Sequence, residues 1–220
     1  MENAVNSPER WHPNMPKSTA FALRSLVKVG YKIEVGDYSY GVPSVRWLPE
    51  QAKFYSLKIG KYCSFAADID IYVGRLGRHT TEFLSTYPIG MVHGPLPPGD
   101  KPKSHEGDLN VSIGSDVWVG RDVQIMAGTT IGHGAVIGAK ALVTGPIPPY
   151  AVAVGAPAKV LRYRFTEQTI ERLLRIRWWD MSPETLTRNN HLFNKADIEM
   201  VVERLEAICE NEPGEQIAGT

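Results

Sequence analysis

The chain of 220 residues is long enough for one large domain or two small ones. Hydrophobic residues make up 43% and charged residues 22%, close to the globular average, which argues against a disordered or fibrous protein. Lysine plus arginine and aspartate plus glutamate are balanced at 24 each, so no overall basic field exists to attract nucleic acid or an anionic membrane.

The cysteines and the N-terminal residues indicate the compartment. Cys63 and Cys209 lie far apart and outside any CxxC spacing, which argues against a disulfide framework or a zinc site. The segment from Met1 to Pro16 is polar and acidic, unlike a signal peptide, and no apolar run reaches the length of a transmembrane helix. The sequence therefore predicts a cytoplasmic protein without a membrane span.

Weak six-residue repeats come first along the chain. Val35-Gly36-Asp37-Tyr38 and Ile59-Gly60-Lys61-Tyr62 share one pattern and lie 24 residues, or four hexads, apart. Residues 41–56 and about 74–110 interrupt the repeats. The second stretch has a proline-rich middle, and a long loop that protrudes from a rigid solenoid is expected to be functional, with a mobile surface excursion as the alternative.

A strict repeat occupies residues 113–143. A period of six fits neither a helix of 3.6 residues per turn nor an ordinary strand. It fits a chain that makes a short strand, turns by about 120° and repeats, so that three hexads close one triangular coil. Each aliphatic side chain then points inward and stacks on its equivalent three hexads later; the alternative is a β-meander with chance spacing. The repeated positions are Ile113, Val119, Ile125, Ile131, Ile137 and Val143.

The chain after the repeat is expected to be helical. Proline cannot donate to a ladder, so Pro146–Pro149 should end the repeat. Thr166, Ser182 and Asn194 are suitable N-caps for three successive helices, and Trp178-Trp179 should cover the open end of the β-helix or contact another subunit. These expectations divide the chain into an N-terminal segment at 1–28, a β-helix at 29–160 and a helical region at 161–220.

Several of these segments resemble one known family. Ile113–Gly120, Ala127–Gly138 and Pro149–Lys159 resemble the hexapeptide-repeat acyltransferases. Arg78–Pro88 and Phe165–Asp180 are similar to the histidine-bearing loop and the C-terminal helix of its xenobiotic branch, the type B chloramphenicol and streptogramin acetyltransferases. The resemblance implies a left-handed parallel β-helix with a protruding catalytic loop and C-terminal α-helices. It also implies a homotrimer that binds acetyl-coenzyme A (acetyl-CoA) between neighbouring subunits.

His79 occupies the position of the loop histidine, which the resemblance implies is the catalytic base. Histidine suits this role near neutral pH, because the acceptor hydroxyl must lose its proton as it attacks the thioester. Glu82 could orient the ring or stabilise its charge, although a backbone carbonyl could serve equally well. Ser85, Thr86 and Tyr87 are expected to assist the oxyanion or the acceptor.

The expected acetyl-donor site combines an indole on a face of the β-helix, small residues and positive charge. The resemblance implies that Trp118 lies near the thioester, with interface packing as the alternative. The small residues of Gly155–Ala158 would let a pantetheine arm approach the backbone. Lys159, Arg162 and Arg164 are placed to meet the nucleotide phosphates, unless they form a solvated basic face. The set expected to bind acetyl-CoA is Trp118, Ala139, Ala141, Gly155, Pro157, Lys159 and Arg162.

The acceptor is the least defined part of the prediction. Residues 41–56 depart from the tyrosine- and histidine-rich segment of drug-modifying members and look more like relatives that acetylate sugars or polysaccharides. Tyr38, Tyr40 and Trp47 are expected to line the acceptor pocket. The leading prediction is therefore O-acetylation of a sugar or polysaccharide hydroxyl. The alternatives are O-acetylation of an antibiotic such as chloramphenicol or a streptogramin, and a β-helix scaffold without catalysis.

No metal is predicted, because acetyl transfer requires none. A carbonic-anhydrase-like protein would need three zinc-binding histidines that converge across a subunit interface, and His79, His105 and His133 lack the family context for this. His133 itself falls at a turn of the repeat, where it should face solvent or a neighbouring subunit.

Overall fold

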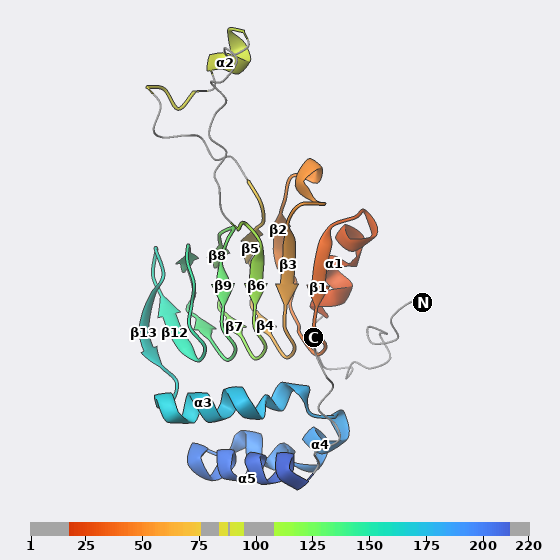
Figure 1. The fold of residues 1–220 in the computed structure, drawn as a ribbon, viewed down its shortest axis with the longest axis vertical. Coiled ribbons are helices and arrows are strands. Elements are labelled where there is room, and N and C mark those ends of the chain that lie inside the picture. The colour runs from red at the N-terminus through yellow and green to blue at the C-terminus, as the bar shows by residue number, and fades with distance from the viewer. Residues whose placement is uncertain (1–17, 76–83, 88, 95–107, 212–220) are drawn as a thin grey trace.

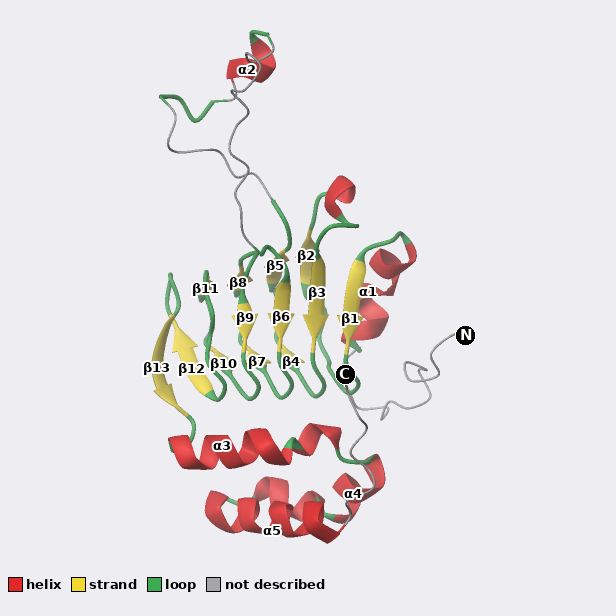
Figure 2. Ribbon diagram, viewed as in Figure 1, coloured by secondary structure: helices red, strands yellow, loops and turns green. Residues whose placement is uncertain are grey.

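The computed structural model describes residues 18–75, 84–87, 89–94 and 108–211. These residues form three β-sheets with helices beside them (Figures 1 and 2). The chain passes through sheets 1, 2 and 3 in turn and then begins again, so each passage is one coil of a parallel β-helix. The predicted fold is confirmed.

Each sheet gathers one side of the successive coils, and only β13 runs antiparallel to its neighbour among the described strands. Sheet 1 contains β1 (Lys32–Val35), β3 (Ser56–Ile59), β6 (Val111–Ile113) and β9 (Thr130–Ile131). Sheet 2 contains β4 (Ser64–Phe65), β7 (Trp118–Val119), β10 (Val136–Ile137), β12 (Ala151–Val154) and β13 (Lys159–Tyr163). Sheet 3 contains β2 (Ser44–Arg46), β5 (Asp70–Tyr72), β8 (Gln124–Ile125) and β11 (Leu142–Val143).

Each corner of the β-helix is named by the sheets that it joins. The 1–2 corner contains residues 36–39, 60–63, 114–117 and 132–135, and the 2–3 corner contains residues 66–69, 120–123 and 138–141. The 3–1 corner contains residues 47–55, 73–75, 108–110, 126–129 and 144–146.

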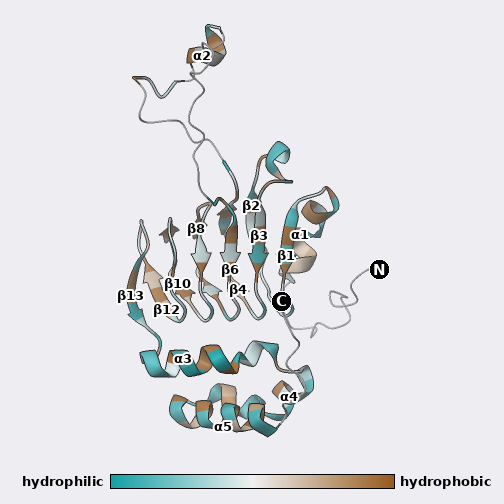
Figure 3. Cartoon of the chain, viewed as in Figure 1, coloured by the Kyte–Doolittle hydropathy of each residue, from teal (hydrophilic) through white to brown (hydrophobic). Residues whose placement is uncertain are grey.

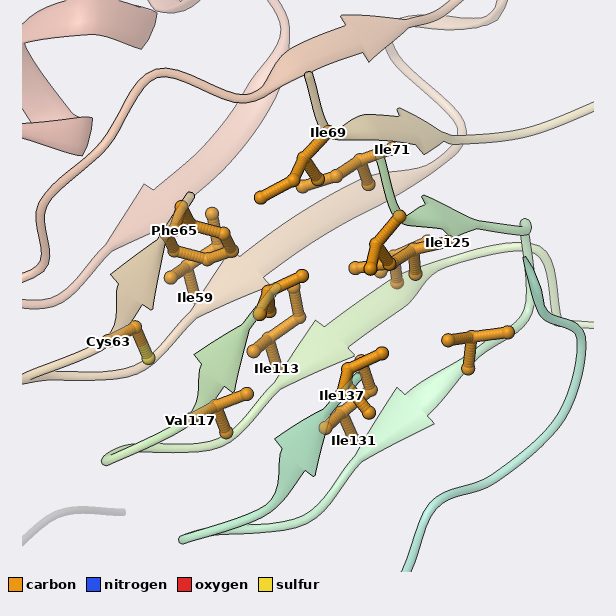
Figure 4. Close-up of a cluster of buried hydrophobic side chains, with 14 of the residues drawn as sticks. Ile59, Cys63, Phe65, Ile69, Ile71, Ile113, Val117, Ile125, Ile131 and Ile137 are labelled. Carbon is orange, nitrogen blue, oxygen red and sulfur yellow. The ribbon is translucent and has the colours of Figure 1, made fainter. Parts of the chain in front are cut away.

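The core is a stack of the repeated aliphatic side chains. Ile113 pairs with Ile131 in sheet 1, Val119 with Ile137 in sheet 2, and Ile125 with Val143 in sheet 3. Each pair spans the predicted eighteen residues, and all six side chains are at most 2% exposed. Figure 4 shows several of them pointing into the space that the sheets enclose. The expected inward stacking is confirmed.

Close contact between coils explains the glycine that follows the aliphatic residue. A Cβ on Gly60 would lie 2.5 Å from the Ser115 amide nitrogen of the next coil, and a Cβ on Gly36 would lie 2.6 Å from the Gly60 carbonyl carbon. Real Cβ atoms do not approach backbone this closely, so a larger residue here would separate the coils.

The repeat continues through two stretches that were expected to interrupt it or end it. Ser44–Arg46, inside the predicted insert at 41–56, forms β2 and pairs with β5, so the insert itself is only residues 47–55. The expectation that Pro146–Pro149 ends the repeat is also wrong. Ile147, between the prolines, both donates to Thr130 O and accepts from Gly132 N, so the ladder needs no N–H from the prolines and continues into β12.

Different elements close the two ends of the β-helix. At the C-terminal end, β13 folds back antiparallel on β12. At the N-terminal end lies α1 (Thr19–Lys28), which begins at the N-cap Ser18 and buries Leu23 in the core. Helix α1 was not predicted, although Ser18 before a run with leucines at positions 23 and 26 is a usable signal.

The C-terminal helices largely follow the prediction. They are α3 (Glu167–Ile176), η4 (Trp178–Asp180), α4 (Pro183–Arg188), η5 (Asn190–Asn194) and α5 (Ile198–Asn211). The side chains of Thr166 and Ser182 cap α3 and α4 as expected. Asn194 is not a cap, because Asp197 instead accepts from the Met200 amide at the start of α5. Apolar and polar stretches alternate along α3 and α5 (Figure 3).

The helical region packs against the 1–2 corner. The Trp179 ring is 1% exposed and stacks on the His133 ring, with centroids 4.6 Å apart and planes at 10°. Lys61 and Asp180 form an ion pair at 2.9 Å. Trp178 contacts Tyr62 of an earlier coil, with ring centroids 5.1 Å apart, so the two tryptophans cover turns of the 1–2 corner and not the open end of the β-helix. His133 likewise does not face solvent freely, and its Nδ1 accepts from the Ser115 amide at 2.8 Å.

Burial sets the protonation of this contact. Burial and, second, nearby Arg177 lower the pKa of His133, against a smaller opposite effect of Asp180. The hydrogen bond from Ser115 also requires the unprotonated Nδ1. The neutral imidazole is therefore the form that fits the folded protein.

We predict that His133 makes folding stability depend on pH. Its pKa is lower in the folded than in the unfolded chain, so its contribution is complete above about pH 6.5 and is lost as the pH falls below that value. Urea unfolding of wild type and His133→Asn at pH 8 and pH 5.5 measures this. The wild type should lose more stability than the variant on acidification, and equal losses would contradict the assignment.

Candidate active site

A row of outward-facing side chains runs across sheet 2. Trp118 is 57% exposed and lies between Ser64 and Val136 on the neighbouring strands. The row continues to Val152 on one side, and an isolated bridge joins Ser64 to Tyr40 on the other. Trp118 and Tyr40 therefore share one face, two ladder steps or about 10 Å apart.

Most of the predicted donor-binding residues lie beside this row. Ala139 is exposed at the 2–3 corner, and Gly155 and Pro157 are exposed in the turn between β12 and β13. Hydrogen bonds from Leu142 N to Gly155 O, at 3.0 Å, and from Ala158 N to Leu142 O, at 2.8 Å, hold this turn against the same corner. The fold thus brings together small residues from two successive coils.

Two predicted donor-binding side chains lie on β13 and one lies in the core. Lys159 and Arg162 are exposed, and Arg162 is in register with Val152 of the outer row. Ala141, in contrast, is 1% exposed, so its side chain is part of the core and only its backbone is near the corner.

The 2–3 corner also carries cations that sequence reasoning missed. Lys140 has a left-handed backbone, with φ at 61°, and pairs with Asp122 of the preceding coil at 3.3 Å. Arg121 lies 3.9 Å from Asp68 in the same way. Lys140 is next to Ala139 in the sequence. It lies near the Gly155 turn only because the coils stack on one another.

Arg164 is half-buried and bonds to two coils of the β-helix. Its Nη1 donates to the Asp116 carboxylate at 3.1 Å and to Gly134 O at 2.7 Å. Burial raises the pKa of Asp116, and Arg164 opposes this shift. The expectation that Arg164 meets the nucleotide phosphates is therefore corrected: it joins β13 to two coils.

The structure does not gather the predicted acceptor residues into one pocket. Tyr38 stacks on Tyr62 at the 1–2 corner, with ring centroids 4.8 Å apart. Tyr40 lies in the outer row of sheet 2. Trp47 is 9% exposed and packs edge-on against Tyr31, near the 3–1 corner. These residues occupy three different parts of the surface or core.

The predicted catalytic loop leaves the β-helix at the 3–1 corner (Figure 1). His79 and Glu82 lie outside the described residues, as does His105. Ser85, Thr86 and Tyr87 are described and exposed, and the Tyr87 amide donates to Ser85 Oγ at 3.1 Å. Short helix α2 (Ile89–Val92) follows them, far from the β-helix (Figure 2).

The root of the loop and the outer row lie on opposite sides of the triangular cross-section. The 3–1 corner is the one corner that sheet 2 does not touch, and the loop both leaves and returns there. Within a single chain, therefore, the root of the predicted catalytic loop is separated from Trp118 by the core of the β-helix.

The described residues contain no group of three or more His, Cys, Asp or Glu side chains arranged to hold a metal ion. Nor does any helix in the described part of the chain have the length and apolar character needed to cross a membrane.

Comparison with known proteins assigns the family. The model of the bacterial transferase hexapeptide (six repeats) matches residues 110–145. A chloramphenicol acetyltransferase of Agrobacterium fabrum is 37% identical over 205 residues, which cover 84% of this chain and 88% of that protein. The chain belongs to the hexapeptide-repeat acyltransferases.

Further relatives place this acyltransferase in the xenobiotic branch. A chloramphenicol acetyltransferase of Klebsiella aerogenes is 33% identical over 70% of this chain and 78% of that protein. A probable macrolide acetyltransferase of Lysinibacillus sphaericus is 35% identical over 60% of this chain and 74% of that protein. The chain is thus an acetyltransferase with the left-handed parallel β-helix of its family.

We predict that Arg162, on β13, and Arg164, just after β13, have different roles in this acetyltransferase. Arg164→Ala should destabilise the fold by about 2 kcal/mol, because it leaves the half-buried Asp116 carboxylate without its partner. Arg162→Ala, the matched control, removes an exposed side chain and should leave stability within about 0.5 kcal/mol. Urea unfolding of both variants checks this, and similar losses would contradict it.

Proposed function

We propose that the protein transfers the acetyl group of acetyl-CoA to an acceptor hydroxyl, with His79 as general base. The observation that supports this most strongly is the grouping of Trp118, Ala139 and the Gly155–Pro157 turn on one side of an acetyltransferase β-helix. These are residues expected to bind the donor, and their grouping depends on coil stacking that the sequence order does not reveal.

The proposed chemistry uses the loop residues. His79 takes the acceptor proton as the hydroxyl oxygen attacks the thioester carbonyl, and Glu82 orients the ring. Hydroxyl or amide groups at Ser85, Thr86 and Tyr87 stabilise the oxyanion of the tetrahedral intermediate. The intermediate then expels the CoA thiolate, which takes a proton from the imidazolium, so the products are the acetyl ester and CoA.

The donor is proposed to lie along the outer row and the 2–3 corner. The Trp118 indole contacts the thioester end, and the small residues Gly155 and Pro157 let the pantetheine arm approach the backbone. Lys159, Arg162 and the adjacent Lys140 offer cations to the phosphates of the nucleotide.

A homotrimer is proposed because one chain does not complete this site. The loop root and Trp118 lie on opposite sides of the β-helix, so the loop of one subunit must meet sheet 2 of another. The outer face of sheet 2 also exposes the large apolar side chain of Trp118, as an interface requires. Three-fold packing of β-helices repeats the same contact around a closed ring.

Two acceptor classes each have an observation in their favour. The names of the relatives favour an antibiotic hydroxyl, as in chloramphenicol or a macrolide. The sequence of the 41–56 segment favours a sugar or polysaccharide hydroxyl. CoA-thiol release with chloramphenicol, a macrolide and simple saccharides separates them, and absence of CoA binding by calorimetry would favour a scaffold without catalysis.

We predict that His79→Ala lowers kcat by about 100-fold or more, because it removes the general base, without changing the unfolding free energy. His93→Ala, on an exposed histidine of the same loop, is the matched control and should retain activity. Steady-state thiol release and urea unfolding measure both effects. Full activity in His79→Ala would remove the base assignment.

We further predict complementation between inactive subunits. His79→Ala alone should be weakly active, and Trp118→Ala alone should be weakly active when acetyl-CoA is well below the KM of that variant. The two variants are unfolded and refolded together in equal amounts. About three quarters of the trimers are then mixed, and each mixed trimer holds one intact site of its three, so about one quarter of wild-type activity should return. No gain on mixing would show that each site lies within one chain.

A further inference from the structure

Two segments of the described chain leave the β-helix at the same corner in successive coils. Residues 47–55 follow β2, and the long loop follows β5, which is the neighbour of β2 in sheet 3 with Arg46 in register with Tyr72. The segments return to β3 and β6, which are neighbours in sheet 1 with Leu57 in register with Val111. The short insert therefore lies directly beside the root of the loop (Figure 1).

The insert holds the first residues of the loop. The Arg75 amide donates to Gln51 Oε1 at 2.7 Å, and Arg75 Nε donates to the Tyr55 hydroxyl at 3.1 Å. Gly74 is pressed between the same two side chains: its φ is +78°, and a Cβ there would lie 2.6 Å from Gln51 Oε1 and 2.9 Å from Tyr55 Cδ2. The direction in which the loop departs is thus set by contacts with the insert.

The returning end of the loop is fixed in a similar manner. The Gly74 amide donates to Leu109 O at 3.2 Å, which joins the two ends of the loop. Asn110 Oδ1 accepts from the Ser56 amide at 2.6 Å, while the Asp108 carboxylate accepts from the Asn110 amide at 2.9 Å. Both ends of the loop are therefore tied to the chain that surrounds the insert.

The insert supplies Trp47 and Ala52 to the core, but the turn that carries Gln51 does not. Its helical turn, η3 (Pro49–Gln51), buries none of its residues. Gln51 lies on this unburied turn and accepts from the loop root, so its side chain is better explained by the loop than by the stability of the β-helix.

We propose that Gln51 and Tyr55 are positioning residues for acetyl transfer, which they support by fixing the root of the loop that carries His79. This rests on the proposed function of His79, which lies only four residues beyond Arg75. A small rotation at Gly74 would displace the base relative to the donor, and a misplacement of about 1 Å can lower a rate by up to about 100-fold. Donor binding, on the outer row of sheet 2, should be unaffected.

Gln51→Ala tests the proposal. We expect kcat to fall about 10-fold, with the KM for acetyl-CoA unchanged, because the acceptor for the Arg75 amide is lost. Gln51→Glu keeps an oxygen acceptor and should restore most of kcat. Glu50→Ala, on the same turn and exposed, is the matched control and should behave as wild type. Tyr55→Phe should lower kcat in the same way as Gln51→Ala, through the bond to Arg75 Nε.

Hydrogen exchange gives a readout that does not depend on activity. Exchange at the Arg75 amide should be faster in Gln51→Ala than in wild type or Glu50→Ala, while amides of β6 and β9 stay protected. An unchanged kcat, or an unchanged exchange rate at Arg75, overturns the proposal. Its failure differs from that of the proposed function, in which wild type shows no acetyl transfer or His79→Ala remains fully active.

Discussion

Contact between successive coils is the constraint on which the rest of the structure depends. The backbone ladder fixes coil spacing at about 4.8 Å, and the aliphatic columns fill the interior only if every side of every coil keeps its length. Gly60 shows how tight this contact is, because its missing Cβ would lie 2.5 Å from the next coil. Extra residues therefore leave the β-helix at corners, where they do not interrupt a ladder.

Each corner consequently has its own content. The 1–2 corner receives the helical region through the His133–Trp179 stack and the ion pairs of Lys61 and Arg164. The 2–3 corner carries Lys140 and the Gly155 turn, with little side-chain bulk. The 3–1 corner releases the short insert and the long loop. The residues proposed to bind the donor and the root of the loop proposed to carry the base lie on opposite sides, which is the arrangement expected if subunits complete one another.

The corners also separate charges that look equivalent along the chain. Arg162 and Arg164 are two residues apart, yet Arg162 is exposed, whereas Arg164 donates hydrogen bonds to the Asp116 carboxylate and to Gly134 O. His133 lies within the most regular part of the repeat, but burial and its bond from Ser115 make it a neutral structural group. Charge and residue type alone therefore do not identify which side chains meet the ligand.

The sequence by itself determined the β-helix, because the β-helix is the fold that buries a six-residue period of β-branched residues and places the phased glycines at its turns. It also determined the N-caps Thr166 and Ser182, because capping depends only on neighbouring residues. It also indicated that the segments around Trp118 and Gly155 bind the donor, but it did not show that the stacking of coils places these segments together. Only the tertiary structure decided what depends on contacts between distant coils. It showed that Ile147 continues the ladder between prolines, that Trp47 is buried beside Tyr31, and that Gln51 and Tyr55 hold Arg75. Such partners lie 16 to 24 residues apart or on another coil, and no local preference of the chain encodes them.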